Sequence, residues 1–121
     1  MQLIDRIYET SKVEAADGSL RDAFPEALPE SHARDLARLV RDLGLVRTLE
    51  TGMAYGLSTL AICGVHEERD DGEHIAIDPH QSSDWQGIGL LNLDRAGLSQ
   101  LVVREDDEVV KTQEGRGHGS K

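Results

Sequence analysis

The sequence predicts an α/β fold built on an incomplete parallel sheet of about three strands, with helices flanking it. Three short β-prone segments occur late in the chain, at Leu45–Leu49, 74–77 and 101–104. Helical patterns separate them, one beginning at Ser58 and one covering residues 84–97. Parallel strands need long crossover connections, so the order strand–helix–strand–helix–strand indicates a parallel sheet.

The first 44 residues are expected to form an N-terminal helical leader, 1–44. Apolar residues recur at helical spacing within residues 1–13, which predicts a short amphipathic helix. Residues 14–29 contain Asp17-Gly18 and two prolines, and they predict an irregular connector. A second helix is expected from Ser31 to Gly44, with an apolar stripe at Leu36, Leu39, Val40 and Leu43.

The rest of the chain divides into an α/β unit, 45–105, and a tail, 106–121. The second strand is expected to break at Asp78-Pro79, because proline cannot donate a hydrogen bond to a neighbouring strand. The helix at 84–97 offers several apolar residues to the core, namely Ile88, Leu91 and Leu93. The tail is acidic and then rich in glycine, and it is predicted to be disordered.

The amino-acid composition argues against some classes of binding partner. The formal net charge is −10, from 23 acidic and 13 basic residues, and this charge repels nucleic acid and anionic membranes. The start of the chain does not resemble a signal peptide, and no apolar stretch approaches the length of a membrane span, so a cytoplasmic protein is expected. The single cysteine, Cys63, lies in an apolar stretch and is expected to be buried and inert. The histidines show no metal-ligand spacing, so no metal site is predicted.

The residues that indicate chemistry lie where the first strand meets the first helix. Glu50, Gly52, Gly56 and Ser58 follow one another through a tight turn into a helix. Glycine allows a ligand to approach the main chain, and the free N–H groups of a helix start favour a carboxylate or phosphate. The spacing Gly-x-x-x-Gly lacks the fingerprint of a dinucleotide site, and Glu50 favours a ligand with a positive centre.

The second strand ends in another acidic residue. Asp78 is placed to accept hydrogen bonds from both ribose hydroxyls of an adenine nucleoside, and Pro79 and His80 follow it. Both acidic residues are expected at the carboxyl ends of adjacent parallel strands, where open α/β sheets bind their ligands. A different nucleotide-binding α/β protein is compatible with Asp78 but is disfavoured by the glycine spacing.

These motifs together resemble the first two motifs of class I S-adenosylmethionine-dependent methyltransferases, in their small-molecule O-methyltransferase-like branch. The resemblance includes the leader, continues through Trp85-Gln86-Gly87-Ile88-Gly89 and ends near Arg104. It implies a Rossmann-like sheet, S-adenosylmethionine as cofactor and a small-molecule methyl acceptor. It identifies neither that acceptor nor any catalytic residue.

Carried over by position, the resemblance assigns a part of the cofactor to each motif. The turn would line the methionine part through its main chain, and Ser58 would meet the carboxylate. Glu50 would favour the cationic end, and Asp78 would take the ribose hydroxyls. The residues expected to bind the cofactor are Glu50, Gly52, Met53, Gly56, Ser58, Asp78, Pro79 and His80.

The resemblance also implies that the chain is truncated, because the family's sheet has more strands than 121 residues allow. Without a fourth strand, Leu45–Leu49 would be an open hydrophobic edge. We expect either a homodimer through that edge or a truncated product that is only marginally folded. Whether the chain is an active enzyme is therefore left open, and the alternative is an inactive remnant that binds another protein through the edge.

Overall fold

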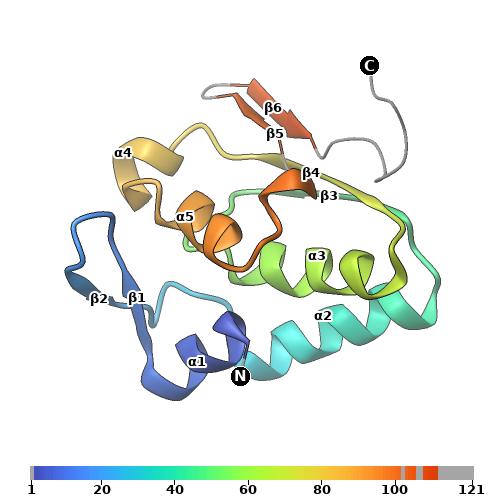
Figure 1. Cartoon of the computed structure of the whole chain (residues 1–121), viewed down its shortest axis with the longest axis horizontal. Helices are drawn as coiled ribbons and strands as arrows, with labels where there is room; N and C mark the ends of the chain where they lie inside the picture. Colours follow the sequence, from blue (N-terminus) through green and yellow to red (C-terminus); the bar gives the residue numbers. More distant parts are fainter. Residues whose placement is uncertain (1, 102, 106–107, 112–121) are drawn as a thin grey trace.

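The computed structural model describes residues 2–101, 103–105 and 108–111, and these form a mixed α/β structure (Figure 1). The described residues contain five α-helices, one short 3₁₀ helix (Ser99–Leu101) and two small sheets. One sheet is a two-stranded hairpin in the leader, and the other has four strands in the order β3-β4-β6-β5.

The leader begins with helix α1 (Leu3–Thr10), which is followed by the antiparallel strands β1 (Lys12–Glu14) and β2 (Leu20–Asp22). The sequence predicted an irregular connector here, so the hairpin corrects that prediction. Its turn is closed locally, because the Ser19 N–H donates to Asp17 Oδ1 at 2.9 Å and Gly18 adopts a φ of +88°. Val13 is buried on the side of the hairpin that faces the core.

Helix α2 (Glu30–Asp42) forms as predicted, but its apolar stripe is only partly buried. Val40 is 2% exposed and packs against α3, whereas Leu39 and Leu43 are 51% and 63% exposed. The face that contacts α3 is narrower than the stripe, so these two leucines point away from the core. Of the predicted stripe, Val40 is fully buried and Leu36 is partly buried.

The central unit is β3 (Arg47–Thr51), α3 (Leu57–Arg69) and β4 (Glu73–Ile77). The two strands pair in parallel with Leu49 opposite Ile75, which confirms the predicted parallel pair. The first strand begins two residues later than predicted, and Leu45 and Val46 are exposed in the connection that precedes it.

The predicted helix at 84–97 is interrupted. The chain forms α4 (Gln81–Trp85) and α5 (Ile88–Arg95), because Gln86 and Gly87 both have positive φ angles between them. Trp85 makes an edge-on contact with Tyr55, with ring centroids 5.0 Å apart.

The third strand departs most from the prediction of a parallel sheet. Strand β5 (Val103–Glu105) pairs only with β6 (Glu108–Lys111) among the described strands, and β6 pairs antiparallel with both β5 and β4. The sheet therefore contains one parallel pair and two antiparallel pairs. Strand β6 lies within the segment 106–121 that the sequence predicts to be disordered, and the rest of that segment lies outside the described residues. The two valines of β6 favour a strand, and the edge of β4 that faces away from β3 supplies its hydrogen-bonding partners. Local sequence patterns do not reveal this pairing.

Helices α3 and α5 cover one face of the sheet, which we call the inner face. Ala76 of β4 is fully buried there in one cluster with Cys63 of α3 and Leu93 of α5. The opposite, outer face carries Leu49, which is 59% exposed, and the partly buried Ile75. This arrangement places the carboxyl ends of β3 and β4 beside the start of α3.

Candidate functional site

The candidate site is centred on residues 52–56, which we call the glycine loop. Gly52 and Gly56 adopt φ angles of +81° and +89°, which favour glycine at both positions. The loop is tied to the next strand, since the Gly52 N–H donates to the Ile77 carbonyl at 2.6 Å. The sequence therefore identified a turn that depends on its glycines.

The two glycines serve different purposes. A Cβ atom on Gly52 would meet no other atom within 4 Å, so this side of the loop is open. A Cβ atom on Gly56 would lie 3.1 Å from the carbonyl oxygen of Gly89, at the start of α5. Gly52 thus leaves room for a ligand, whereas Gly56 allows α3 and α5 to approach each other closely.

A cavity of about 350 Å³ lies beside the loop. The glycine loop and the first residues of α3 form one wall, and the connector 25–29 of the leader forms the other. Leu57 and Ser58 line it at the start of α3, where the first N–H groups of the helix have no partner within the helix. These donors and the positive end of the helix dipole suit an anionic group. The volume lies at the lower end of the range of small-molecule pockets, which is roughly 300–1,000 Å³.

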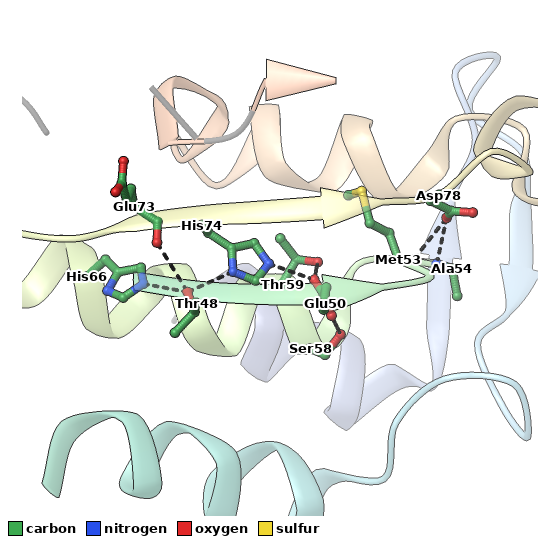
Figure 2. Close-up of polar contacts among 10 residues, drawn as sticks. All are labelled: Thr48, Glu50, Met53, Ala54, Ser58, Thr59, His66, Glu73, His74 and Asp78. Atoms are coloured by element: carbon green, nitrogen blue, oxygen red, sulfur yellow. Dashed lines mark hydrogen bonds and ion pairs between the residues drawn. The ribbon is translucent and has the colours of Figure 1, made fainter. Parts of the chain in front are cut away.

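Asp78 anchors the glycine loop. Its side chain is buried, and Oδ2 accepts hydrogen bonds from the main-chain N–H groups of Met53 at 2.9 Å and Ala54 at 3.2 Å (Figure 2). The other oxygen, Oδ1, accepts the N–H of His80 at 3.2 Å. Asp78 is not among the residues that line the cavity. The carboxylate therefore shapes the loop in this structure and has remaining acceptor capacity at Oδ1.

Gln81 is a site residue that the sequence analysis missed. Its side chain is fully buried, and Nε2 donates to Asp78 Oδ2 and to the Ala54 carbonyl, both at 2.9 Å. Its Oε1 accepts the N–H of Gly89 at 2.8 Å. One side chain thus connects β4, the glycine loop and α5. Asp78 and Gly89 lie three and eight residues from Gln81, but the contact with Ala54 spans 27 residues, and no local pattern marks a glutamine for this role.

Glu50 points to the inner face rather than into the cavity. Its carboxylate accepts hydrogen bonds from the hydroxyls of Ser58 and Thr59 and lies 2.9 Å from His74 Nε2 (Figure 2). Because Glu50 already accepts the hydroxyl proton of Ser58, the hydroxyl of Ser58 is not free to donate into the cavity. The main-chain N–H groups at the start of α3 remain the donors for the cavity.

The structure brings together some of the predicted site residues and separates others. Three of them line the cavity, namely Gly52, Met53 and Ser58. Glu50 and Asp78 do not line the cavity, but they accept hydrogen bonds from residues that do. Pro79 and His80 are exposed at the end of β4, outside the cavity lining.

Cys63 lies on the inner face beneath this site. It is fully buried, and burial together with the nearby Glu50 carboxylate raises the pKa of its thiol. The structure confirms the predicted burial of this cysteine. Within the described part of the chain, no group of acidic, histidine and cysteine side chains is arranged to hold a metal ion.

Comparisons with known proteins do not assign the chain to a family, since no protein-family model and no curated protein matches it. Among the described residues, no helix has both the length and the apolar character needed to cross a membrane.

Proposed function

We propose that this chain binds S-adenosylmethionine at the glycine loop, as the cofactor-binding part of a class I methyltransferase with a Rossmann-like α/β unit. The observation that carries the proposal is the cavity at the carboxyl end of β3, lined by the glycine loop and the start of α3. Open α/β sheets bind their ligands at this end of parallel strands.

The residues of the cavity fit the methionine part of this cofactor. The N–H groups at the start of α3 suit its carboxylate, and the open side of Gly52 leaves space against the main chain. The high negative charge of the whole chain is compatible with a ligand that carries a positive centre.

The ribose part is assigned to Asp78. One of its oxygens is already used by the glycine loop, so the ribose hydroxyls would meet Oδ1. The bound cofactor would supply an electrophilic methyl group, and the residues of this chain would bind and orient it. Positioning of the reacting groups supplies much of the rate in such a transfer.

Calorimetric titration with S-adenosylhomocysteine tests this proposal. We expect micromolar binding by the wild-type chain and loss of binding in Gly52→Val, whose side chain enters the open side of the loop. Gly18→Val is the matched control, because Gly18 also has a positive φ but lies in the distant hairpin turn. A folded wild-type chain that does not bind S-adenosylhomocysteine, or that binds NAD instead, would contradict the proposal.

A second candidate function is self-association through β3, and the distribution of exposed apolar residues favours it. Within residues 2–100, whose exposure the structure describes, the large exposed hydrophobic residues other than Leu20 in the hairpin all fall within residues 39–49. Strand β3 is an edge of the four-stranded sheet, and its main-chain bonds to β4 begin at Val46 and end at Gly52, at alternate residues. The N–H and C=O groups of Arg47, Leu49 and Thr51 therefore face away from β4.

The partner proposed for this edge is a second copy of the chain in antiparallel pairing. A two-fold axis at Leu49 would place Leu49 opposite Leu49 and Arg47 opposite Thr51, which avoids direct contact between like charges. Sedimentation velocity should show a dimer for the wild-type chain and a monomer for Leu49→Lys. A wild-type chain that stays monomeric at the highest soluble concentration would contradict this candidate.

A further inference from the structure

A chain of hydrogen bonds runs beneath the sheet from Arg69, at the end of α3, to Glu50. The heavy-atom distances along it are 3.1 Å from Arg69 Nη2 to His66 Nδ1 and 2.9 Å from His66 Nε2 to Thr48 Oγ1. They continue at 2.8 Å from Thr48 Oγ1 to His74 Nδ1 and 2.9 Å from His74 Nε2 to Glu50 Oε1. Figure 2 shows the part from His66 onward. Both histidines are fully buried, so these contacts are shielded from solvent.

The direction of the first two bonds follows from donor and acceptor chemistry. A guanidinium group has only donors, so the Nδ1 atom of His66 accepts the bond from Arg69 and carries no proton. The ring of His66 is therefore neutral with its proton on Nε2. That proton is donated to Thr48 Oγ1.

The direction at Thr48 follows from two distances. Its hydroxyl has one proton and two acceptors within reach, His74 Nδ1 at 2.8 Å and the Glu73 carbonyl at 3.3 Å. The 2.8 Å distance lies within the range of a hydroxyl donor, as it does within that of a ring N–H donor, whereas 3.3 Å exceeds the usual range of a hydroxyl donor. We therefore assign the hydroxyl proton of Thr48 to the contact with His74; on this assignment the ring of His74 is neutral and donates from Nε2 to Glu50.

Glu50 is thus the end of a chain in which every bond points the same way. Its carboxylate, with 13% of the side chain exposed, accepts from His74 and from the hydroxyls of Ser58 and Thr59. Charge-assisted bonds of this kind are stronger than neutral ones. They connect the end of β3 to the first turn of α3 and so hold the two sides of the glycine loop together.

We propose that Thr48 is a positioning residue for the ligand site: its hydroxyl relays a one-directional hydrogen-bond chain through two neutral histidines to Glu50 and thereby holds the glycine loop. The ligand named for this loop rests on the proposed function. The chain itself does not, because its direction follows from the contacts of buried side chains.

Nitrogen-15 NMR of the histidine side chains at pH 7 tests the direction of the chain. We expect the signals of His66 and His74 to show neutral rings protonated at Nε2. An imidazolium signal from His74, or a proton on Nδ1 of either ring, would overturn the proposal.

Thr48→Val and Thr48→Ser test the positioning role in the ligand-free protein. Valine has the shape of threonine but breaks the chain in its middle, whereas serine keeps the hydroxyl. We expect the N–H groups of Gly52 and Gly56 to exchange with solvent about tenfold faster in Thr48→Val, and within twofold of wild type in Thr48→Ser. Equal exchange in the two variants would overturn the proposal.

The same pair of variants measures the consequence for the ligand. Binding of S-adenosylhomocysteine should weaken about tenfold in Thr48→Val and remain within twofold in Thr48→Ser. A wild-type chain that does not bind S-adenosylhomocysteine would overturn the proposed function alone, because the exchange rates of Gly52 and Gly56 would still decide the role of Thr48.

Discussion

The two faces of strand β3 differ in an unusual way. The inner face carries the polar side chains of Thr48 and Glu50, which are largely covered by α3, and the outer face carries Leu49, which is mostly exposed. A strand with one solvated face normally shows the opposite alternation, with apolar residues inside. The inner face therefore depends on complete hydrogen bonding of its polar side chains, whereas the outer face presents an exposed apolar side chain that a partner could cover.

The largest effect is expected from Glu50→Ala. This change leaves two fully buried donors, on Thr59 and His74, and the partly buried hydroxyl of Ser58 without their shared acceptor. Removal of one partner from a buried charged network costs about 3–5 kcal/mol, so urea unfolding should show a loss of that size. The exposed Glu26 provides the control, since Glu26→Ala should change stability by less than about 0.5 kcal/mol. Similar losses in both variants would show that the inner face does not depend on this network.

The next largest effect concerns the thiol of Cys63, on the helix that covers the inner face. Its pKa is raised, first by burial and then by the charge of Glu50, so the reactive thiolate is depleted at pH 8. We expect alkylation by iodoacetamide to be at least about a hundredfold slower in the native chain than in urea. Comparable rates in the two conditions would indicate that the inner face opens readily.

A smaller effect on stability is expected on the outer face. Leu49→Thr replaces an exposed leucine with a β-prone polar residue, so the free energy of unfolding should change by less than about 0.5 kcal/mol. The same variant should lower self-association in sedimentation experiments if a second copy covers this edge. A loss above about 2 kcal/mol in dilute, monomeric protein would mean that Leu49 is buried within its own chain.

The smallest effect is expected from Arg47→Ala on the same face. Arg47 lies 2.6 Å from Glu73, but its side chain is 83% exposed, and such pairs contribute about 0–1 kcal/mol. Thermal unfolding in low and high salt should therefore differ little between this variant and the wild type. A marked loss only in low salt would show that the pair contributes more than its exposure suggests.

Local patterns predicted the central unit well. The β-prone segment before Glu50, the glycine turn and the helix after Gly56 are all consecutive in the chain, and the order of these elements indicated the parallel pair. The same patterns failed for the hairpin in residues 12–22 and for the break between α4 and α5. The hairpin depends on the pairing of two three-residue strands, which are too short to show a clear pattern. The break in the helix depends on positive φ angles at Gln86 and Gly87, and the helical spacing of the neighbouring apolar residues does not indicate them.

The candidate site shows the same division. Gly52 and Gly56 were identifiable because positive φ angles favour glycine whatever surrounds them. The role of Asp78 in holding the loop was not, because its partners on Met53 and Ala54 lie about 25 residues away. Gln81 was missed because its contact with the Ala54 carbonyl spans 27 residues and nothing local marks this glutamine as buried.

The order of β3, α3 and β4, the position of the glycine loop and the burial of Cys63 could be predicted from residues that are neighbours along the chain. The inward orientation of Glu50, the anchoring of the loop by Asp78 and the contacts of Thr48 with two histidines depend on how the elements pack in three dimensions. These side chains meet across two strands and a helix. Buried polar groups must find partners wherever the packing brings them, and that choice is made by the fold as a whole.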